Sequence, residues 1–276
     1  MSITRNRLSA LSAPLLCTSL ALGGLLTACG DDDPASASGP TSAATGNSST
    51  GSSSATRSFV AFGDSWPYGA HCNGCTPFPD LYAAALNAEA PTEFTNLTED
   101  GGSTESLLSE MRTYEPYRDA IAGADVIVIS IGANDLEEAF ASYGAGDCGP
   151  PDDLGCFREV ADGWGQNMDA MLGEIHDLRG DQPTAIRVLT QANELDQGLI
   201  EGFGDTFVYE KLPQVMAWQQ EEYCRVADTH HDRCVDLRPV LNGTDFNELR
   251  DVNTQQAMQE VADRLLAIGL PELTDA

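Results

Sequence analysis

The sequence predicts an α/β fold, a three-layer αβα sandwich built on a five-stranded parallel sheet. Apolar, strand-like runs alternate with helical patterns from residue 58 onward. Such alternation is typical of a parallel sheet that lies between two layers of helices. One run, Asp125–Ile131, is nearly all apolar. This composition fits a central strand that is covered on both faces.

Each element follows from its own pattern. Strands are expected at Ser58–Phe62, Glu93–Leu97, Asp125–Ile131, Ala185–Thr190 and Arg233–Leu237. Helices are expected at Pro79–Ala88, Thr104–Arg112, Pro116–Ala122, Arg158–Leu178, Tyr209–His230 and Thr254–Ile268. The last helix has one apolar face, made of Ala257, Val261, Leu265 and Ile268. Two acidic stretches, Leu136–Phe157 and Glu194–Thr206, are expected as loops that shape a substrate pocket and favour a neutral or cationic substrate.

The N-terminal residues lie outside this fold. Residues 1–28 are predicted to be a lipoprotein signal peptide, because Arg5 and Arg7 precede an apolar stretch broken by Ser, Pro and Gly. That stretch ends in Leu26–Cys29, which resembles the lipobox of bacterial lipoproteins, where the cysteine is lipidated. The alternative is an ordinary secretion signal with a chance cysteine.

The lipidated Cys29 and the Gly/Ser-rich residues up to 57 are expected to form a disordered tether. Residues 58–276 then suit one domain. This organisation predicts an exported bacterial lipoprotein of the cell envelope, held at a membrane by its lipid and facing the periplasm or the cell surface. The sequence does not indicate whether this membrane is the inner or the outer one.

The net charge bears on binding partners, and the cysteine spacing bears on disulfide bonds. The formal net charge is −29, which would repel phosphate backbones and so excludes nucleic acid as a partner. Beyond Cys29, six cysteines form sequence-local pairs, Cys72–Cys75, Cys148–Cys156 and Cys224–Cys234, which are expected to be disulfides in an exported protein. The first pair could instead be a redox or metal-binding motif, although zinc would need a second pair of ligands.

Polar residues follow the first three predicted strands. Ser65 follows the first, Gly101–Thr104 the second and Gly132–Asp135 the third. Because parallel strands end at one edge of the sheet, these residues are expected to converge there. A serine hydroxyl can attack an acyl carbon, while a glycine N–H and an asparagine amide can donate to the oxyanion that develops.

These segments resemble the conserved blocks of the GDSL-type, or SGNH, ester hydrolases. GDSWPYG (63–69) looks like the first block, GGSTESLL (101–108) the second and GAND (132–135) the third. The resemblance implies a flavodoxin-like fold that cleaves esters without a metal or cofactor. It also implies that Ser65 is the nucleophile and that Gly102 and Asn134 hold the oxyanion.

The fourth block of that family, Asp-x-x-His ahead of the last helix, has no counterpart here. By spacing from the closing helix, Glu248 and Asp251 stand near the places of the acid and the histidine. Asp228–His231 spells the motif but precedes the fifth strand, and His176 precedes the fourth, so both are expected at the opposite edge.

His71, six residues after Ser65, is the one histidine expected at the edge that holds Ser65. It is a candidate general base, because catalytic triads are defined by geometry and not by chain order. The competing reading is a surface histidine without a role. A third reading makes Asp251 a direct base with a raised pKa.

Two functions therefore remain open. The first is a lipid-anchored serine ester hydrolase of the esterase, lipase or deacetylase type, acting on a small-molecule or polymer-borne ester. The second is a catalytically impaired protein of the same fold that binds an acyl or glycan ligand. The sequence does not indicate which ester is cleaved.

Overall fold

The computed structural model describes residues 56–150, 152–193, 197–243 and 248–274. All of them belong to one compact unit, Ser52–Ala276. The predicted signal peptide, Cys29 and most of the tether lie outside the described residues.

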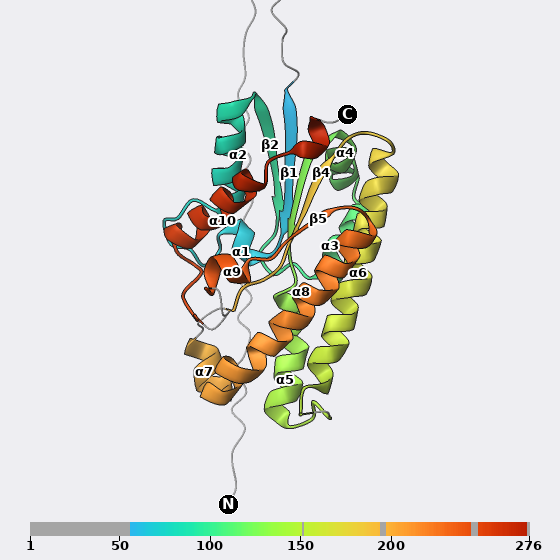
Figure 1. The fold of residues 1–276 in the computed structure, drawn as a ribbon. Coiled ribbons are helices and arrows are strands. Elements are labelled where there is room, and N and C mark those ends of the chain that lie inside the picture. Colours follow the sequence, from blue (N-terminus) through green and yellow to red (C-terminus); the bar gives the residue numbers. More distant parts are fainter. Residues whose placement is uncertain (1–55, 151, 194–196, 244–247, 275–276) are drawn as a thin grey trace, which may run out of the picture. The chain divides into compact units, whose positions relative to one another are not determined.

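The core is a five-stranded, fully parallel sheet with the strand order β2-β1-β3-β4-β5 (Figure 1). The strands are β1 Arg57–Gly63, β2 Thr92–Thr98, β3 Val126–Ser130, β4 Ala185–Leu189 and β5 Arg233–Val235. Each lies within two residues of its predicted bounds. All five residues of β3 and of β4 are buried, as expected of strands covered on both faces.

Helices follow or precede each strand. The α-helices are α1 Ser65–Tyr68, α2 Phe78–Glu89, α3 Thr104–Thr113, α4 Glu115–Gly123, α5 Glu137–Ala145, α6 Gly155–Arg179, α7 Gln197–Phe203, α8 Leu212–Thr229, α9 Arg238–Leu241 and α10 Gln255–Ile268. Short 3₁₀ helices are η1 Asn134–Leu136 and η3 Pro271–Leu273, and a π-helical turn, η2 Phe207–Lys211, precedes α8.

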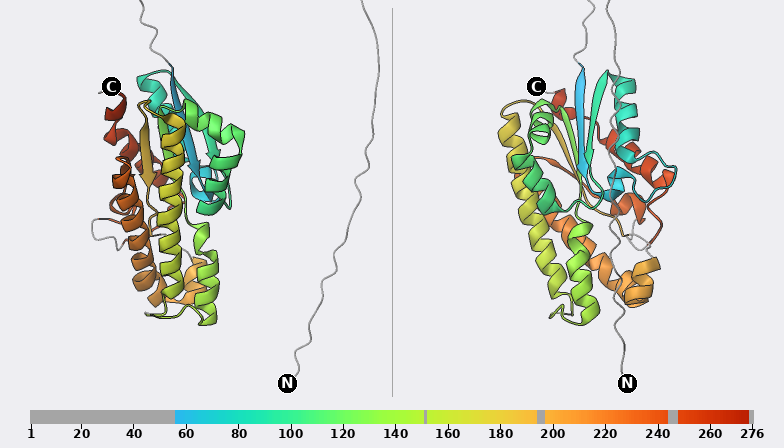
Figure 2. Two further views of the ribbon diagram at one scale, coloured as in Figure 1. Left: turned by 90° about the vertical axis from the view of Figure 1, so that its right-hand side faces the viewer. Right: turned by 180° about the vertical axis from the view of Figure 1, so that it is seen from behind.

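The side chains of the central strands alternate between two cores. Val60 and Phe62 of β1 pack with α3, α4, α6 and α8 on one face of the sheet. Phe59 and Ala61 pack with α2 and α10 on the other. Figures 1 and 2 show these helices as two layers with the sheet between them, which confirms the three-layer sandwich. In α10, Ala257, Val261 and Leu265 are buried, as its pattern predicts.

The two acidic stretches expected as loops are partly helical, so that expectation was wrong. Residues 137–145 form α5, and α6 begins at Gly155; residues 197–203 form α7. Aromatic rings join these segments: Phe140 stacks on Phe203 with a centroid distance of 5.5 Å, and Tyr143 lies 4.6 Å from Phe207. Contacts between distant segments therefore stabilise helices whose Gly- and Asp-rich surroundings suggest loops.

The three predicted cysteine pairs are disulfides in the structure: Cys72–Cys75, Cys148–Cys156 and Cys224–Cys234. None of the helices in the described ranges is both long and apolar enough to span a membrane.

Candidate active site

Ser65 lies at the carboxyl edge of the sheet, immediately beyond β1. β1 ends at Gly63, Asp64 caps helix α1, and Ser65 is the first residue of that helix. The cap forms because the Asp64 carboxylate accepts a hydrogen bond from the backbone N–H of Trp66 at 3.2 Å. Ser65 is half-buried.

The two predicted oxyanion donors lie side by side. Asn134 follows β3 in η1, and its Nδ2 donates to the carbonyl oxygen of Gly102 at 2.8 Å. The Gly102 N–H closes a turn onto the oxygen of Glu99 at 3.2 Å, and Glu99 N–H in turn binds the oxygen of Gly63 at 2.9 Å. The loops after β1, β2 and β3 are thus joined at one edge. One hydrogen of the Asn134 amide remains for a ligand, since Nδ2 carries two.

Asp64 connects the first loop to the third. Its Oδ2 accepts hydrogen bonds from the backbone N–H groups of Gly132 at 3.1 Å and Ala133 at 3.2 Å. The side chain is 1 % exposed. Burial raises the pKa of the Asp64 carboxyl to about 6, although the backbone donors of Ala133, Trp66 and Gly132 oppose that shift. Asp64 therefore joins the backbone that follows Ser65 to the loop after β3.

A second, half-buried carboxylate joins the loops after β2 and β3. Asp135 accepts from the backbone N–H of Thr104 at 3.1 Å and also from the Thr104 hydroxyl. Asn167 of α6 donates to that same hydroxyl oxygen at 2.8 Å. Burial raises the pKa of Asp135, and the Thr104 donors partly offset this effect. These contacts hold the Gly102 loop against Asn134.

Side chains of helices α6 and α8 hydrogen-bond to the backbone of the loop after β3. Trp164 Nε1 donates to the oxygen of Gly132 at 3.1 Å, and the Tyr223 hydroxyl donates to the oxygen of Ile131 at 3.0 Å. Gly132 has a φ of +126°, and a Cβ there would lie 2.7 Å from Gln219 Nε2 and 2.9 Å from both Trp164 Nε1 and the Tyr223 hydroxyl. Only glycine fits this position without strain.

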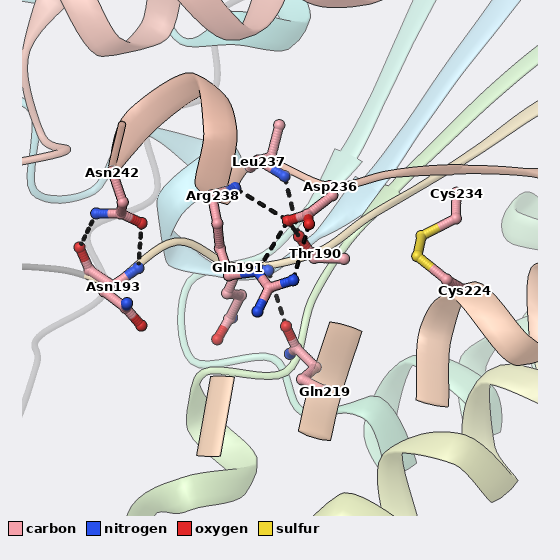
Figure 3. Close-up of polar contacts among 10 residues, drawn as sticks. All are labelled: Thr190, Gln191, Asn193, Gln219, Cys224, Cys234, Asp236, Leu237, Arg238 and Asn242. Carbon is pink, nitrogen blue, oxygen red and sulfur yellow. Dashed lines mark hydrogen bonds and ion pairs between the residues drawn. A yellow bond between two sulfur atoms is a disulfide. The ribbon is translucent and has the colours of Figure 1, made fainter. Parts of the chain in front are cut away.

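The ends of β4 and β5 form the other side of the site (Figure 3). Gln219 Oε1 accepts from the backbone N–H of Gln191 at 2.8 Å. Thr190 Oγ1 accepts from the Leu237 N–H at 3.0 Å and donates to Asp236 at 3.2 Å. The side-chain amide of Asn242 accepts from the backbone N–H of Asn193 at 2.8 Å and donates to the Asn193 carbonyl oxygen at 2.7 Å. The segment 190–193 is thereby fixed beside the loops that carry Ser65 and Asn134.

The segment before α10 packs against the loop that follows Ser65. Trp66 Nε1 donates to the oxygen of Val252 at 3.2 Å, and Thr76 N–H donates to Gln255 Oε1 at 2.9 Å. The Val252 side chain is 5 % exposed. By contrast, Asp251 is exposed, and its carboxylate accepts from the backbone N–H of Asn253 at 2.8 Å. The segment therefore places the carbonyl oxygen of a buried valine, and not the Asp251 carboxylate, at the Trp66 indole.

A small cavity of about 70 Å³ opens between these segments. Its lining is Trp66, Ala133, Gln191, Ala192 and Val252. Each of the loops after β1, β3 and β4 contributes to it, together with the segment before α10. The cavity thus lies at the edge of the sheet that holds Ser65.

The four histidines divide between the two ends of the sheet. His71 is exposed and lies on the loop between α1 and α2, next to the Cys72–Cys75 disulfide. His176 and His230 lie near the C-terminal ends of α6 and α8, where their rings stack at 5.7 Å. Each pairs with a carboxylate, Asp232 at 2.9 Å and Asp169 at 2.8 Å. Asp228–His231 and His176 are therefore far from Ser65 along the strands, as the sequence predicts.

The sequence reasoning missed three residues that build this site: Asp64, Gln191 and Val252. Asp64 caps α1, as an aspartate between a strand and a helical serine typically does, but no local pattern marks its further bonds to Gly132 and Ala133. Thr254, which caps α10, fixes the register that places Val252 two residues before the helix boundary. No sequence signal marks Gln191, because its place depends on Gln219 of α8. No group of three His, Cys, Asp or Glu side chains within the described ranges could hold a metal ion.

Comparison with known proteins places this geometry in context. The family model for the GDSL-like Lipase/Acylhydrolase family matches residues 61–256. A search of curated proteins finds no match.

Among solved structures, the lipase Lip_vut3 from a goat rumen metagenome is similar, with a TM-score of 0.64 and 18 % identity over 78 % of this chain and 98 % of that one. An extracellular lipase from Streptomyces rimosus has a TM-score of 0.53 and 17 % identity, covering 77 % of this chain and 99 % of that one. A variant of Axe2, an acetylxylan esterase from Geobacillus stearothermophilus, has a TM-score of 0.53 and 15 % identity, covering 78 % and 94 %.

At these identities the structural likeness shows the fold, whereas the family model covers well over half of the sequence, from β1 to the start of α10. The chain belongs to the GDSL-like lipase/acylhydrolase family.

Proposed function

We propose that this protein is a serine ester hydrolase in which Ser65 is the nucleophile. The observation that carries the proposal is the convergence of three loops on one edge of the sheet. Asn134 bonds directly to Gly102, and the Asp64 carboxylate joins the backbone beside Ser65 to that beside Asn134. Family membership supports the same reaction class.

The reaction follows from the groups at that edge. Ser65 Oγ attacks the ester carbonyl carbon and gives up its proton to a base. The oxyanion accepts a hydrogen bond from the second hydrogen of Asn134 Nδ2 and from the Gly102 N–H, which must turn from Glu99. The C–O bond to the alcohol then breaks, the alcohol takes the proton, and water later releases the acid from Ser65.

We propose His71 as the base. Of the four histidines in the sequence, it is the one that lies at the same edge as Ser65. Its loop contacts the first turn of α10, because the Thr76 N–H donates to Gln255. Asp251 is the weaker candidate, since its exposed carboxylate accepts from the Asn253 backbone, and it is the Val252 carbonyl that accepts from Trp66 Nε1.

The location is also a proposal. The Leu26–Cys29 stretch and the apolar residues before it support export and lipidation at Cys29. The tether that follows would then hold the hydrolase domain away from the lipid surface.

Hydrolysis of 4-nitrophenyl acetate by the full chain tests the chemistry. We expect Ser65→Ala to abolish turnover above background, and His71→Ala to lower kcat/KM by about 10²- to 10⁴-fold because the proton acceptor is removed. His231→Ala is the matched control, since it removes another exposed histidine at the opposite end of the sheet.

Three outcomes separate the possibilities. Wild-type turnover equal to that of Ser65→Ala would overturn the enzyme and favour an impaired, ligand-binding protein. If His71→Ala behaves like His231→Ala, His71 is not the base. A loss of activity in Asp251→Asn of the same size as in Ser65→Ala would assign the proton transfer to that carboxylate.

A further inference from the structure

We infer that a hollow at the amino edge of the sheet binds a small monocarboxylate, with Arg57 as the residue that holds the carboxylate group. The inference goes beyond the proposed hydrolase and does not depend on it. It rests on the lining of the hollow, on the partners of the charged groups there, and on the contrast with the other hollows of the domain.

This hollow, the Arg57 hollow, lies at the end of the sheet opposite to Ser65. Its volume is about 440 Å³, and it is lined by the first residue of β1, the last residue of α6 and residues of the C-terminal segment. The charged lining residues are Arg57, Arg179 and Asp125, and the apolar ones are Pro183, Leu270 and Leu273. The hollow therefore places two cationic groups beside an apolar wall.

Arg57 carries a hydrogen-bond donor that no protein group uses. Its Nη1 atom is buried without a hydrogen-bond partner, and none of the ion pairs among the described residues includes Arg57. A buried donor on a charged group is costly when it has no acceptor. An anion in the Arg57 hollow would supply that acceptor and balance the charge.

The other two charged groups of the hollow are already engaged. Arg179 donates from all three of its side-chain nitrogens to protein oxygens, at distances from 2.6 to 3.3 Å. The Asp125 carboxylate accepts from the backbone N–H of Ser58 at 2.8 Å and lies 4.0 Å from Arg179 Nη2. Arg179 and Asp125 thus balance each other, which leaves the charge of Arg57 for a ligand.

The interior next to Arg57 holds further donors. The Tyr82 hydroxyl and Arg187 Nε are buried without a partner, and both side chains are 0 % exposed. Burial raises the pKa of Tyr82 to about 12, and the charges of Arg187 and Arg57 oppose that shift, so both act on the same hydroxyl. The charge of Arg187 is paired with Glu272 at 2.9 Å. Unused donors in this region favour an anion over a cation.

Other hollows of the domain lack this combination. In the hollow of about 460 Å³ between α6 and α8, Arg225 pairs with Glu222 at 2.6 Å, and two aspartates also line it. In a neighbouring hollow, Arg158 lies over a tryptophan ring among three acidic residues. The hollow beside α5 is lined by three acidic residues and no arginine, and the cavity beside Trp66 has no charged residue.

The charge and the walls define the ligand class. A carboxylate offers two oxygens to one guanidinium and carries a single charge, which matches the one unpaired arginine. The net charge of −29 disfavours anions of higher charge, such as phosphate. The apolar lining, Pro183, Leu270 and Leu273, provides contact for an alkyl chain. Short-chain monocarboxylates are therefore the expected ligands.

Titration of the full chain with sodium butanoate tests the inference. The rise in unfolding temperature is followed at an ionic strength held constant with sodium chloride, since a ligand of the folded state stabilises it by mass action. We expect a saturable rise for wild type. Butanoate should bind more tightly than acetate, by about 4-fold for each methylene that is buried.

Substitution of the arginine locates the site. Arg57→Gln should weaken butanoate binding by about 10-fold or more, because a charge-assisted hydrogen bond is lost. Arg57→Lys keeps the charge without the planar fork, so its loss should be smaller than that of Arg57→Gln. Arg264→Gln is the matched control, because it removes an exposed arginine of α10 that does not line the hollow. Each variant is compared with itself at zero ligand, so a change in its basal stability does not alter the result.

Four outcomes would overturn the inference. The first is no rise with butanoate beyond that with chloride, and the second is equal binding by Arg57→Gln and Arg264→Gln. Inorganic phosphate that binds as tightly as butanoate would contradict a monocarboxylate site. Binding that is lost in Asn134→Ala and retained in Arg57→Gln would place the carboxylate at the candidate active site. Ester turnover enters none of these measurements, so they stand apart from the proposed function.

Discussion

At the scale of single residues, Asp64 organises the site more than any residue that the motifs emphasise. It caps α1 through Trp66 N–H and binds the Gly132 and Ala133 N–H groups. The same carboxylate therefore holds the nucleophile loop and the loop that carries Asn134. A neutral amide could not accept all of these bonds, because its NH₂ group is a donor.

Burial of Asp64 predicts a pH-dependent stability. Folding raises the pKa of this carboxyl from 3.8 to about 6, so the folded protein binds the proton more tightly than the unfolded chain does. The contribution of Asp64 to the free energy of unfolding is fully present below about pH 4 and declines as pH rises through 6, by about 3 kcal/mol in total. Asp64→Asn lacks this titration.

Chemical denaturation of wild type and Asp64→Asn at pH 4 and pH 7 measures the effect. The difference in unfolding free energy between the two proteins should change by about 2 kcal/mol between these pH values, with wild type losing more on going to pH 7. Comparing the two proteins cancels the other titrating groups. An unchanged difference would show that Asp64 titrates alike in the folded and unfolded states.

Not all residues of the site could be predicted from the sequence. Ser65, Gly102 and Asn134 were placed at one edge because each follows a strand, and the structure joins their loops there. The segment before α10 was harder, because its register depends on the capping residue Thr254 and on the contact of Val252 with Trp66. Such contacts join residues far apart in the chain and leave no local pattern.

At the scale of elements, helices α6 and α8 determine the shape of the loop after β3. Trp164 belongs to α6, and Gln219 and Tyr223 belong to the neighbouring helix α8. Together these three side chains surround the backbone of Gly132. Since that glycine has a positive φ, any side chain there would combine backbone strain with a clash against three buried polar groups.

We therefore expect Gly132→Ala to lower the free energy of unfolding by about 2 kcal/mol or more and to lower ester turnover. Gly173→Ala in α6 is the matched control, because a Cβ at that helical position meets nothing within 4 Å. That substitution should be neutral or stabilising by up to about 1 kcal/mol. Denaturant titration of both variants checks the prediction, and a Gly132→Ala protein as stable as Gly173→Ala would contradict it.

The strands and the larger helices followed from local periodicity, whereas α5, α7 and the π-helical turn did not. These elements pack through Phe140, Phe203 and Phe207, which come from separate parts of the chain. Their sequences are short and lie among glycine and acidic residues, so local propensity favours loops. Tertiary contact between aromatic rings overrides that preference.

At the scale of the whole molecule, the fold gathers segments from most of the domain at one edge of a parallel sheet. The loops after β1, β2, β3 and β4 and the segment before α10 all meet there. The opposite edge carries a different cluster, in which the stacked His176 and His230 pair with Asp232 and Asp169. This separation explains why an Asp-x-x-His spelling alone does not identify a base.

Covalent trapping tests the central claim, that Ser65 is the reactive nucleophile, most directly. The full chain is treated with a fluorophosphonate bearing a methyl group on phosphorus, so that Ser65 Oγ displaces fluoride and forms a P–O bond. Mass spectrometry of the digested protein should then show one adduct per chain, on the peptide that contains Ser65, and none in Ser65→Ala. No adduct on wild type, or an adduct on another residue that persists in Ser65→Ala, would contradict the account.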